Sequence, residues 1–326
     1  MSQTVSQPPI IDAVPVSTEP AIELKSLRKV YGKNVAVDDL SLSVDYGEVF
    51  GFLGPNGAGK TTSIKMLMGL VYPTSGRARL LGRPLGDRQA RKQIGYLPEL
   101  FRFHEWLTGS EFLDLHGQLY GMSSAARAKR IPEVLALVDL SAEAHRKLRT
   151  YSKGMQQRIG LAQSLLNNPR LVFLDEPTSA LDPLGRRDVR AILSRLHHEG
   201  VTIFLNSHLL SEVELSSDRV AIIDRGRVAA VGRVEDLLSR DLMVEFRLGP
   251  ITPETIAELG ELLHIECVTD GDHTLISART SNEETVAMAV DLLSRNGVKV
   301  YGVMPERRSL EDVFVDVVSP TRDGGR

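Results

Sequence analysis

A glycine-rich segment holds the residues best suited to chemistry in this chain. Gly54-Pro55-Asn56-Gly57-Ala58-Gly59-Lys60-Thr61 fits the pattern G-x-x-x-x-G-K-[ST], in which glycines let backbone N–H groups curl around a phosphate at a helix N-terminus. In this pattern the lysine meets the β- and γ-phosphates of a nucleotide, and the hydroxyl that follows it can hold Mg²⁺. The segment predicts a nucleotide site, and the alternative is a plain tight turn between a strand and a helix.

Two carboxylates follow a second apolar segment. Leu171-Val172-Phe173-Leu174 leads directly into Asp175 and Glu176, where a purely structural strand would rarely place two acids. We expect Asp175 to bind Mg²⁺ directly or through water, and Glu176 to orient or deprotonate an attacking water. A surface turn that begins with two acids is the alternative, and the phosphate-binding pattern elsewhere in the chain argues against it.

Hydrophobic spacing predicts the elements that position these residues. An apolar strand over 49–53 enters the glycine-rich segment, and a helix over 61–70 leaves it. Between about 101 and 170 the strand signals give way to helical patterns over 111–119, 124–138 and 155–166, which predicts a helical insertion. Strands return at 171–174, 201–205 and 220–223, with a helix over 184–198. This alternation predicts an α/β fold with a mostly parallel, covered sheet.

The segment from 242 to 318 has a different order of elements. The predicted elements are strand 242–248, helix 253–263, strand 265–269, strand 274–278, helix 283–295 and strand 298–304. Thr252 before Pro253, and Ser281 with Glu284, are typical of helix starts, and Asp270-Gly271-Asp272 is typical of a hairpin turn. The order β-α-β-β-α-β predicts a small α+β, ferredoxin-like domain, followed by a short helix from about Ser309.

Several short motifs occur in the order found in the ATP-binding-cassette (ABC) ATPases. The segment 175–182, DEPTSALD, resembles their Walker B motif and D-loop, and 151–158, YSKGMQQR, resembles their signature, usually LSGGQ. His208 matches the switch histidine, Tyr31 the aromatic that stacks on adenine, and Glu99 in GYLPE the glutamine of the Q-loop. The resemblance covers residues 21–240. It departs from the pattern at Lys153 and Met155, which replace Gly and Gln, and at Glu99, which keeps an oxygen ligand but adds a charge.

The resemblance implies a P-loop NTPase fold with ATP and Mg²⁺ as cofactors. The catalytic residues that it implies are Lys60, Glu176 and His208, and the metal ligands are Thr61, Glu99 and Asp175. The nucleotide-binding residues that it implies are Tyr31, Gly54, Pro55, Asn56, Gly57, Ala58, Gly59, Lys60, Thr61, Thr62, Ser152 and Gly154. Tyr31 packing on a strand, and His208 as a hydrogen-bonded structural residue, are the alternatives for these two positions.

The family resemblance also implies partners. Two chains would sandwich two ATP molecules, with Ser152 and Gly154 of one chain completing the site around Lys60 of the other, in a homodimer or a closely related heterodimer. The YSKGM signature with Pro-Glu in the Q-loop resembles the subgroup that serves drug, sodium, lipopolysaccharide-type and haem-export permeases. We therefore expect a separate integral-membrane permease and a peripheral position on the cytoplasmic face of the cell membrane. The alternatives are a soluble mechanical ABC ATPase and a nucleotide-binding regulator, and Glu176 argues against the regulator.

Composition limits the remaining possibilities. The 326 residues carry 39 Lys and Arg against 42 Asp and Glu, which argues against a nucleic-acid partner. No uncharged run approaches the ~20 apolar residues that span a bilayer. The predicted organisation is a disordered leader over 1–20, an ATP-binding domain over 21–240, an accessory domain over 241–319 and a tail over 320–326. Cys267 is expected in a core, and Trp106 either in the helical core or in a groove for a permease helix.

Overall fold

The computed structural model describes residues 19–318, except 101, 180, 239–241, 270, 272 and 281. The predicted tail and all but the last two residues of the predicted leader lie outside the described residues. So do Ala180 of the predicted D-loop and both aspartates of the predicted hairpin turn. The chain divides into two compact units, Met1–Gly232 and Arg233–Arg326.

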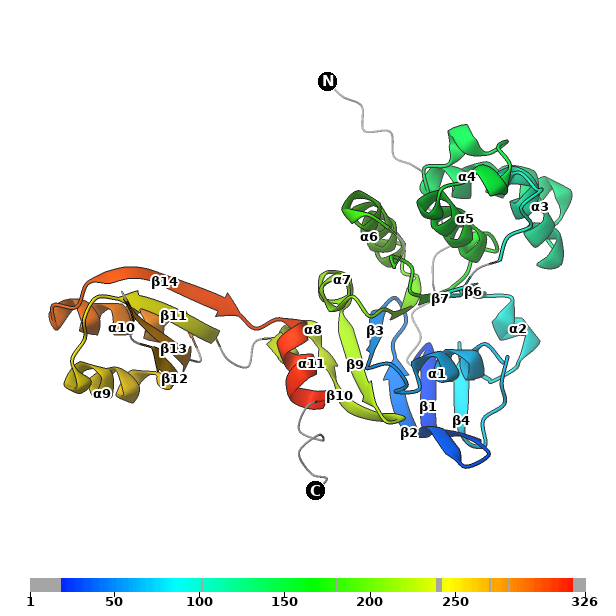
Figure 1. Ribbon diagram of the computed structural model, residues 1–326. Helices are drawn as coiled ribbons and strands as arrows, with labels where there is room; N and C mark the ends of the chain where they lie inside the picture. The colour runs from blue at the N-terminus through cyan, green and yellow to red at the C-terminus, as the bar shows by residue number, and fades with distance from the viewer. Residues whose placement is uncertain are drawn as a thin grey trace. The chain divides into compact units, whose positions relative to one another are not determined.

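A ten-stranded sheet forms the frame of the first unit, among the residues that the structure describes (Figure 1). In sheet order the strands are β5 (Arg83–Pro84), β4 (Ser75–Leu80), β1 (Ile22–Tyr31), β2 (Asn34–Val44), β10 (Arg227–Arg233), β9 (Arg219–Asp224), β3 (Val49–Leu53), β8 (Thr202–Asn206), β7 (Leu171–Asp175) and β6 (Ile94–Leu97). The neighbours β9, β3, β8, β7 and β6 run parallel, as predicted for a covered sheet. The strands β5, β4, β1 and β2 are antiparallel, an arrangement on which the sequence analysis made no prediction.

The parallel strands end at one edge of the sheet, and this brings distant segments together. Asn206 pairs with Phe52 of β3 on one side and with Asp175 of β7 on the other. The residues that follow β3, β7 and β8 are therefore neighbours at the carboxyl edge, where ligands collect in α/β folds.

Aromatic side chains fill the core beneath this edge. Phe204 of β8 is fully buried, and its ring centroid lies 5.8 Å from that of Phe50, 5.0 Å from Phe52 and 5.2 Å from Phe173. Such ring contacts add to the free energy gained by apolar burial. The rings therefore hold the neighbouring strands β3, β8 and β7 together close to the segments that follow these strands.

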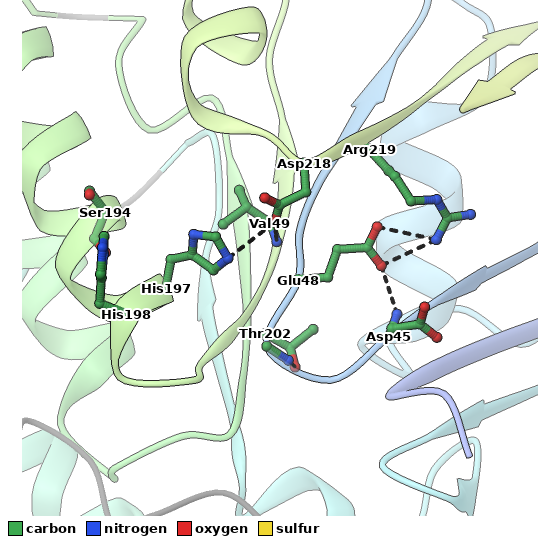
Figure 2. A network of polar contacts seen from close by, with 10 residues as sticks. Asp45, Glu48, Val49, Ser194, His197, His198, Thr202, Asp218 and Arg219 are labelled. Carbon is green, nitrogen blue, oxygen red and sulfur yellow. Dashed lines mark hydrogen bonds and ion pairs between the residues drawn. The ribbon is translucent and has the colours of Figure 1, made fainter. Parts of the chain in front are cut away.

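The amino edge of the same strands is held by a polar network (Figure 2). The carboxylate of Glu48 accepts two hydrogen bonds from the guanidinium of Arg219, at 3.1 and 3.3 Å. Asp218 accepts a hydrogen bond of 2.8 Å from the backbone N–H of Val49, and His197 Nε2 lies 3.2 Å from the same carboxylate oxygen. These contacts fix the first residues of β3 and β9 relative to each other.

The helices of the first unit include a separate group of three. The helices are α1 (Lys60–Leu67), α2 (Arg88–Arg91), α3 (Gly109–Leu119), α4 (Ser124–Leu137), α5 (Lys153–Leu165), α6 (Pro183–His198) and α7 (Leu210–Ser216), with short 3-10 turns at Ser141–Glu143 and Leu148–Thr150. Figure 1 shows α3, α4 and α5 gathered together in green, as the predicted helical insertion requires. Trp106, just before α3, is 68% exposed, so its placement in the helical core is wrong. None of the helices in the described part of the chain is long and apolar enough to span a bilayer.

The second unit has the predicted β-α-β-β-α-β order. Its elements are α8 (Val234–Leu238), β11 (Leu242–Leu248), α9 (Pro253–Leu262), β12 (His264–Thr269), β13 (Thr274–Thr280), α10 (Glu283–Arg295), β14 (Val300–Arg307) and α11 (Leu310–Val318). The strands pair antiparallel in the order β12-β13-β11-β14, which is the ferredoxin-like arrangement. The core contains alternate residues of β11 and β13 together with Leu259, Ala289 and Leu293, and α11 packs on α8.

Two predictions for the second unit need correction. Cys267 is exposed on β12, because β12 is an edge strand and five of its six residues are exposed. Asn282, rather than Ser281, caps α10, since the Asn282 side chain accepts a hydrogen bond of 2.9 Å from the backbone N–H of Thr285. Ser281 itself lies outside the described residues. The predicted cap at Thr252 is confirmed by its hydrogen bond to the N–H of Thr255, at 3.3 Å.

Candidate functional site

The glycine-rich segment forms a tight loop between β3 and α1. A Cβ atom added at Gly54 would lie 2.3 Å from the carbonyl oxygen of Ile223, and one at Gly59 would lie 2.3 Å from that of Ala36. Gly59 also has a φ of +104°, which side chains rarely adopt. Only glycine fits these two positions, so the loop can close tightly over the start of α1, where the backbone N–H groups of a helix N-terminus favour an anion.

Lys60 is the first residue of α1 and lies at the centre of the site. Its Nζ donates to the carbonyl oxygens of Gly54 and Pro55, at 2.7 and 3.1 Å. Burial lowers the pKa of Lys60, and the negative charges of Glu176, Asp175 and Glu99 act against this. The predicted catalytic lysine and three predicted acidic residues are thus close in space.

Asp175 ends β7 and is only 2% exposed. Burial raises the pKa of its carboxyl group, while a hydrogen bond from Asn206 and one from the backbone N–H of Glu99 favour the charged form. The Asn206 bond joins Nδ2 to Asp175 Oδ1 at 2.5 Å. Sequence analysis did not assign Asn206 to the site. An amide at the carboxyl end of a buried strand, two residues before His208, is the signal that could have identified it.

Glu176 has a strained backbone and a direct contact with His208. Its φ is +57°, an uncommon value for a residue other than glycine, of the kind found at functional sites. Its N–H donates to the Asn206 carbonyl at 2.9 Å, and its own carbonyl accepts from Gln157 Nε2 at 3.3 Å. These bonds stabilise the backbone that directs the carboxylate.

The carboxylate of Glu176 pairs with the imidazole of His208. Oε2 lies 2.7 Å from His208 Nδ1, and because an ionised carboxylate only accepts, Nδ1 carries the proton in this contact. Burial raises the pKa of Glu176, and the nearby His208 opposes the shift. A raised pKa suits a group that takes a proton from water near neutral pH.

Two of the predicted magnesium ligands, Asp175 at the end of β7 and Glu99 after β6, interact with each other. The backbone of Glu99 bonds to the Asp175 carboxylate, and burial together with the charges of Asp175 and Glu99 raises the pKa of Tyr96 to about 12. Among the described residues, no group of three or more His, Cys, Asp or Glu side chains could hold a metal alone. Mg²⁺ usually takes one or two carboxylates plus phosphate oxygens and water, so this donor set fits Mg²⁺ only when a nucleotide is also present.

Two groups of predicted residues lie apart from this cluster. Tyr31 ends β1 and is 47% exposed, which disfavours a packing role on the strand, and the Lys29 ammonium lies 4.9 Å from its ring centroid. Ser152 caps α5 by accepting a hydrogen bond of 3.2 Å from the Met155 N–H. Within the described part of the chain, neither Ser152 nor Gly154 bonds to the phosphate-binding loop. Thr61 is exposed and Thr62 half-buried at the start of α1.

Comparisons with known proteins identify the family. The model of the ABC transporter family matches residues 37–179. An uncharacterized ABC transporter ATP-binding protein of Synechocystis sp. is 39% identical over 324 residues, which cover 96% of this chain and 89% of that protein. The daunorubicin/doxorubicin resistance ATP-binding protein DrrA of Streptomyces peucetius is 38% identical over 316 residues, which cover 94% of this chain and 96% of that protein.

A solved structure agrees with this assignment. The dimeric ATP-binding cassette MJ0796, in a post-hydrolysis state with ADP and Pi, superposes with a TM-score of 0.60 at 27% identity, covering 65% of this chain and 98% of that one. The fold, the phosphate-binding loop and the similarity over almost the full length lead to one conclusion. This chain belongs to the ABC transporter family, as an ATP-binding subunit with an ABC ATPase domain.

Proposed function

We propose that this chain hydrolyses ATP with Mg²⁺ as one half of a dimer and drives a separate membrane permease in export. The observation that carries the proposal is the contact between Glu176 and His208 beside Lys60. A buried carboxylate with a raised pKa lies 2.7 Å from an imidazole, and the cation of Lys60 is close enough to feel its charge. This arrangement offers a base for water and a positive charge for a phosphoryl group.

Each residue then has a role in the reaction. The backbone of 54–59 and Lys60 hold the β- and γ-phosphates, with Thr62 beside them, and Tyr31 stacks on adenine. Thr61, Asp175 and Glu99 supply oxygen ligands for Mg²⁺, which when bound neutralises charge on the phosphates. Glu176 takes the proton of the attacking water. His208 holds Glu176 in place and contacts the γ-phosphate.

Dimerisation completes the proposed site. Ser152 is exposed at the N-terminus of α5, where backbone N–H groups favour an anion. We infer that Ser152 and Gly154 meet the γ-phosphate held by a second copy or a closely related chain. The relative MJ0796, solved as a dimer with ADP and Pi, supports this arrangement.

The proposed load is an integral-membrane permease. Leu100 and Trp106, which follow Glu99 in the chain, are 86% and 68% exposed, and we assign them to the surface that meets the permease. DrrA is a drug resistance ATP-binding protein, which supports export. We infer a peripheral position at the cytoplasmic face of the cell membrane. The strands of the second unit pair in the order β12-β13-β11-β14, and we assign this unit a contact role. A soluble mechanical ATPase is the second candidate, and no observation favours it.

Purified protein tests the catalytic assignment. Lys60→Ala should leave less than a tenth of the ATPase rate, because the cation beside the transferring phosphate is lost. Lys65→Ala is a matched control, because Lys65 is exposed on the same helix. This variant should hydrolyse ATP as the parent does. Equal activity of Lys60→Ala and Lys65→Ala would refute the assignment of Lys60.

Mixing two inactive variants tests the shared site. Ser152→Arg should block the contact to a partner's γ-phosphate, and Lys60→Ala should disable the phosphate loop. A hybrid of the two has one intact composite site, so the mixture should regain part of the activity. Proven hybrids without any recovery would argue against a shared site, and copurification with a permease from detergent-solubilised membranes would separate the exporter from a soluble ATPase.

A further inference from the structure

Asn206 ends β8 beside the two carboxylates and is only 2% exposed. Parallel pairing places it directly opposite Asp175. The four residues before it, Thr202 to Leu205, are all buried, as is typical of a strand covered on both faces. An amide group at such a position is costly unless it has hydrogen-bonding partners.

Asn206 contacts both carboxylate residues, through different groups. Its side-chain Nδ2 donates to Asp175 Oδ1 at 2.5 Å, and its backbone carbonyl accepts from the N–H of Glu176 at 2.9 Å. Because a carboxylate only accepts, the amide nitrogen must face Asp175, and this fixes the direction of the amide oxygen. One residue therefore sets the side chain of Asp175 and the backbone of Glu176.

The amide oxygen of Asn206 is the unexplained part of this arrangement. It is buried and has no hydrogen-bonding partner among the described residues. Buried acceptors in native proteins nearly always have a partner. The water molecules that Mg²⁺ retains in protein sites are donors of the required kind.

We propose that Asn206 is a positioning residue for the magnesium site. Its amide N–H holds the Asp175 carboxylate toward the metal, and its amide oxygen accepts a hydrogen bond from a water of the metal's hydration shell. The inference rests on the proposed MgATP function. A purely structural role, in which Asn206 only joins β8 to β7, is the alternative.

Thr202 provides a matched control at the other end of β8. It is fully buried, and its Oγ1 accepts a hydrogen bond of 3.0 Å from the backbone N–H of Gly47. Thr202→Val removes this buried hydrogen bond with little change of shape. In the same way, Asn206→Leu removes the hydrogen bond between Asn206 and Asp175 with little change of shape. Both substitutions weaken the same strand, but only Asn206→Leu alters the residues around the proposed metal.

The test measures binding of a fluorescent ATP analogue to the full chain, first with EDTA and then with increasing Mg²⁺. For Asn206→Leu and Asn206→Ala we expect nucleotide affinity without metal to stay within about twofold of the parent. The Mg²⁺ concentration for the half-maximal gain in affinity should rise about 10- to 100-fold, the usual effect of removing a partner of a metal ligand. Thr202→Val should titrate as the parent does.

Parent-like Mg²⁺ titration of Asn206→Ala would overturn the proposal, and so would an equal shift for Thr202→Val. The alanine variant carries the test alone if Asn206→Leu does not fold. A parent that shows no Mg²⁺-dependent gain in affinity, or a Lys60→Ala chain that binds as the parent does, would instead refute the proposed function and the inference with it. Failure of the inference and failure of the proposed function are distinguishable, because failure of the proposed function appears in chains that still carry Asn206.

Discussion

Replacing Glu176 with glutamine should stop hydrolysis while ATP still binds. In the parent, Glu176 Oε2 lies 2.7 Å from His208 Nδ1. The glutamine side chain keeps the size of glutamate and this contact, but it cannot take a proton from water. Loss of a general base lowers a rate by about 10²- to 10⁴-fold, or about 2.7–5.4 kcal/mol of activation free energy. None of the loop residues 54–59 is altered, so nucleotide affinity should stay close to that of the parent.

The effect on stability is expected to be small. A hydrogen bond to a charged group contributes about 1.5–3 kcal/mol and a neutral one about 0.5–1.5, so the contact with His208 weakens by about 1 kcal/mol. Burial acts in the opposite direction, since it raises the pKa of Glu176 and thus disfavours the charge that glutamine removes. The Tm of the variant should therefore lie no more than about 4 °C below that of the parent.

The assay compares phosphate release and binding of a fluorescent ATP analogue in the same preparations. Light scattering with ATP measures dimer formation, which should increase in Glu176→Gln because the bound ATP persists. Glu261→Gln, on the exposed surface of α9, controls for the change in charge. A Glu176→Gln protein that hydrolyses ATP within threefold of the parent, or fails to bind it, would refute the role given to Glu176.

Three further predictions concern the pH dependence of stability, the core and the second unit. The Tm of Glu176→Gln relative to the parent should increase as the pH rises above 4.5. The pKa of Glu176 in the folded parent is raised above its ordinary 4.5, so the folded parent retains a proton that the unfolded chain has released. The contribution of Glu176 to the stability of the parent therefore falls as the pH rises through the raised pKa, and Glu176→Gln lacks this loss. A Tm difference that is constant with pH would contradict this. Phe204→Ala should lower the free energy of unfolding, measured in urea, by about 3–5 kcal/mol, because Phe204 is fully buried among Phe50, Phe52 and Phe173. Tyr72→Ala is the control, since Tyr72 is 85% exposed and its replacement should change the free energy of unfolding little. A chain that ends at Gly232, the last residue of the first unit, should still bind ATP. Its ATP-dependent dimerisation in sedimentation, or its copurification with the permease, should be weaker than for the full-length chain. Dimer and permease yields equal to those of the full-length chain would reject a contact role for the second unit.

Sequence analysis predicted the elements that depend on local signals. The strand over 242–248 and the helix over 283–295 have the bounds that the structure shows, because alternation and helical spacing are unbroken in both. The tight turn between β3 and α1 was predictable for the same reason, since the glycines that it requires, Gly54 and Gly59, lie within one short motif of the sequence. Its role in binding phosphate stays a prediction.

The antiparallel half of the sheet was not predictable in this way. The pairing of β1 with β2 changes register three times between Leu24 and Val30, and each irregularity breaks the alternation by which a strand is recognised. In β4 only Ala78 and Leu80 are buried, so its apolar signal is short. The contribution of Asn206 was also hidden, because it depends on the register between β7 and β8, two strands separated by a long helix.

The position of Cys267 gives the molecule a natural attachment point for spectroscopy. It is the only cysteine in the sequence, and it is exposed on an edge strand of a unit that contains none of the proposed ATP-binding residues. A maleimide spin label therefore reacts once per chain, without any other cysteine to remove first. Two labelled copies joined by ATP would carry one pair of spins, and the distance between them, followed by electron resonance through a cycle of hydrolysis, would record how far the second units travel.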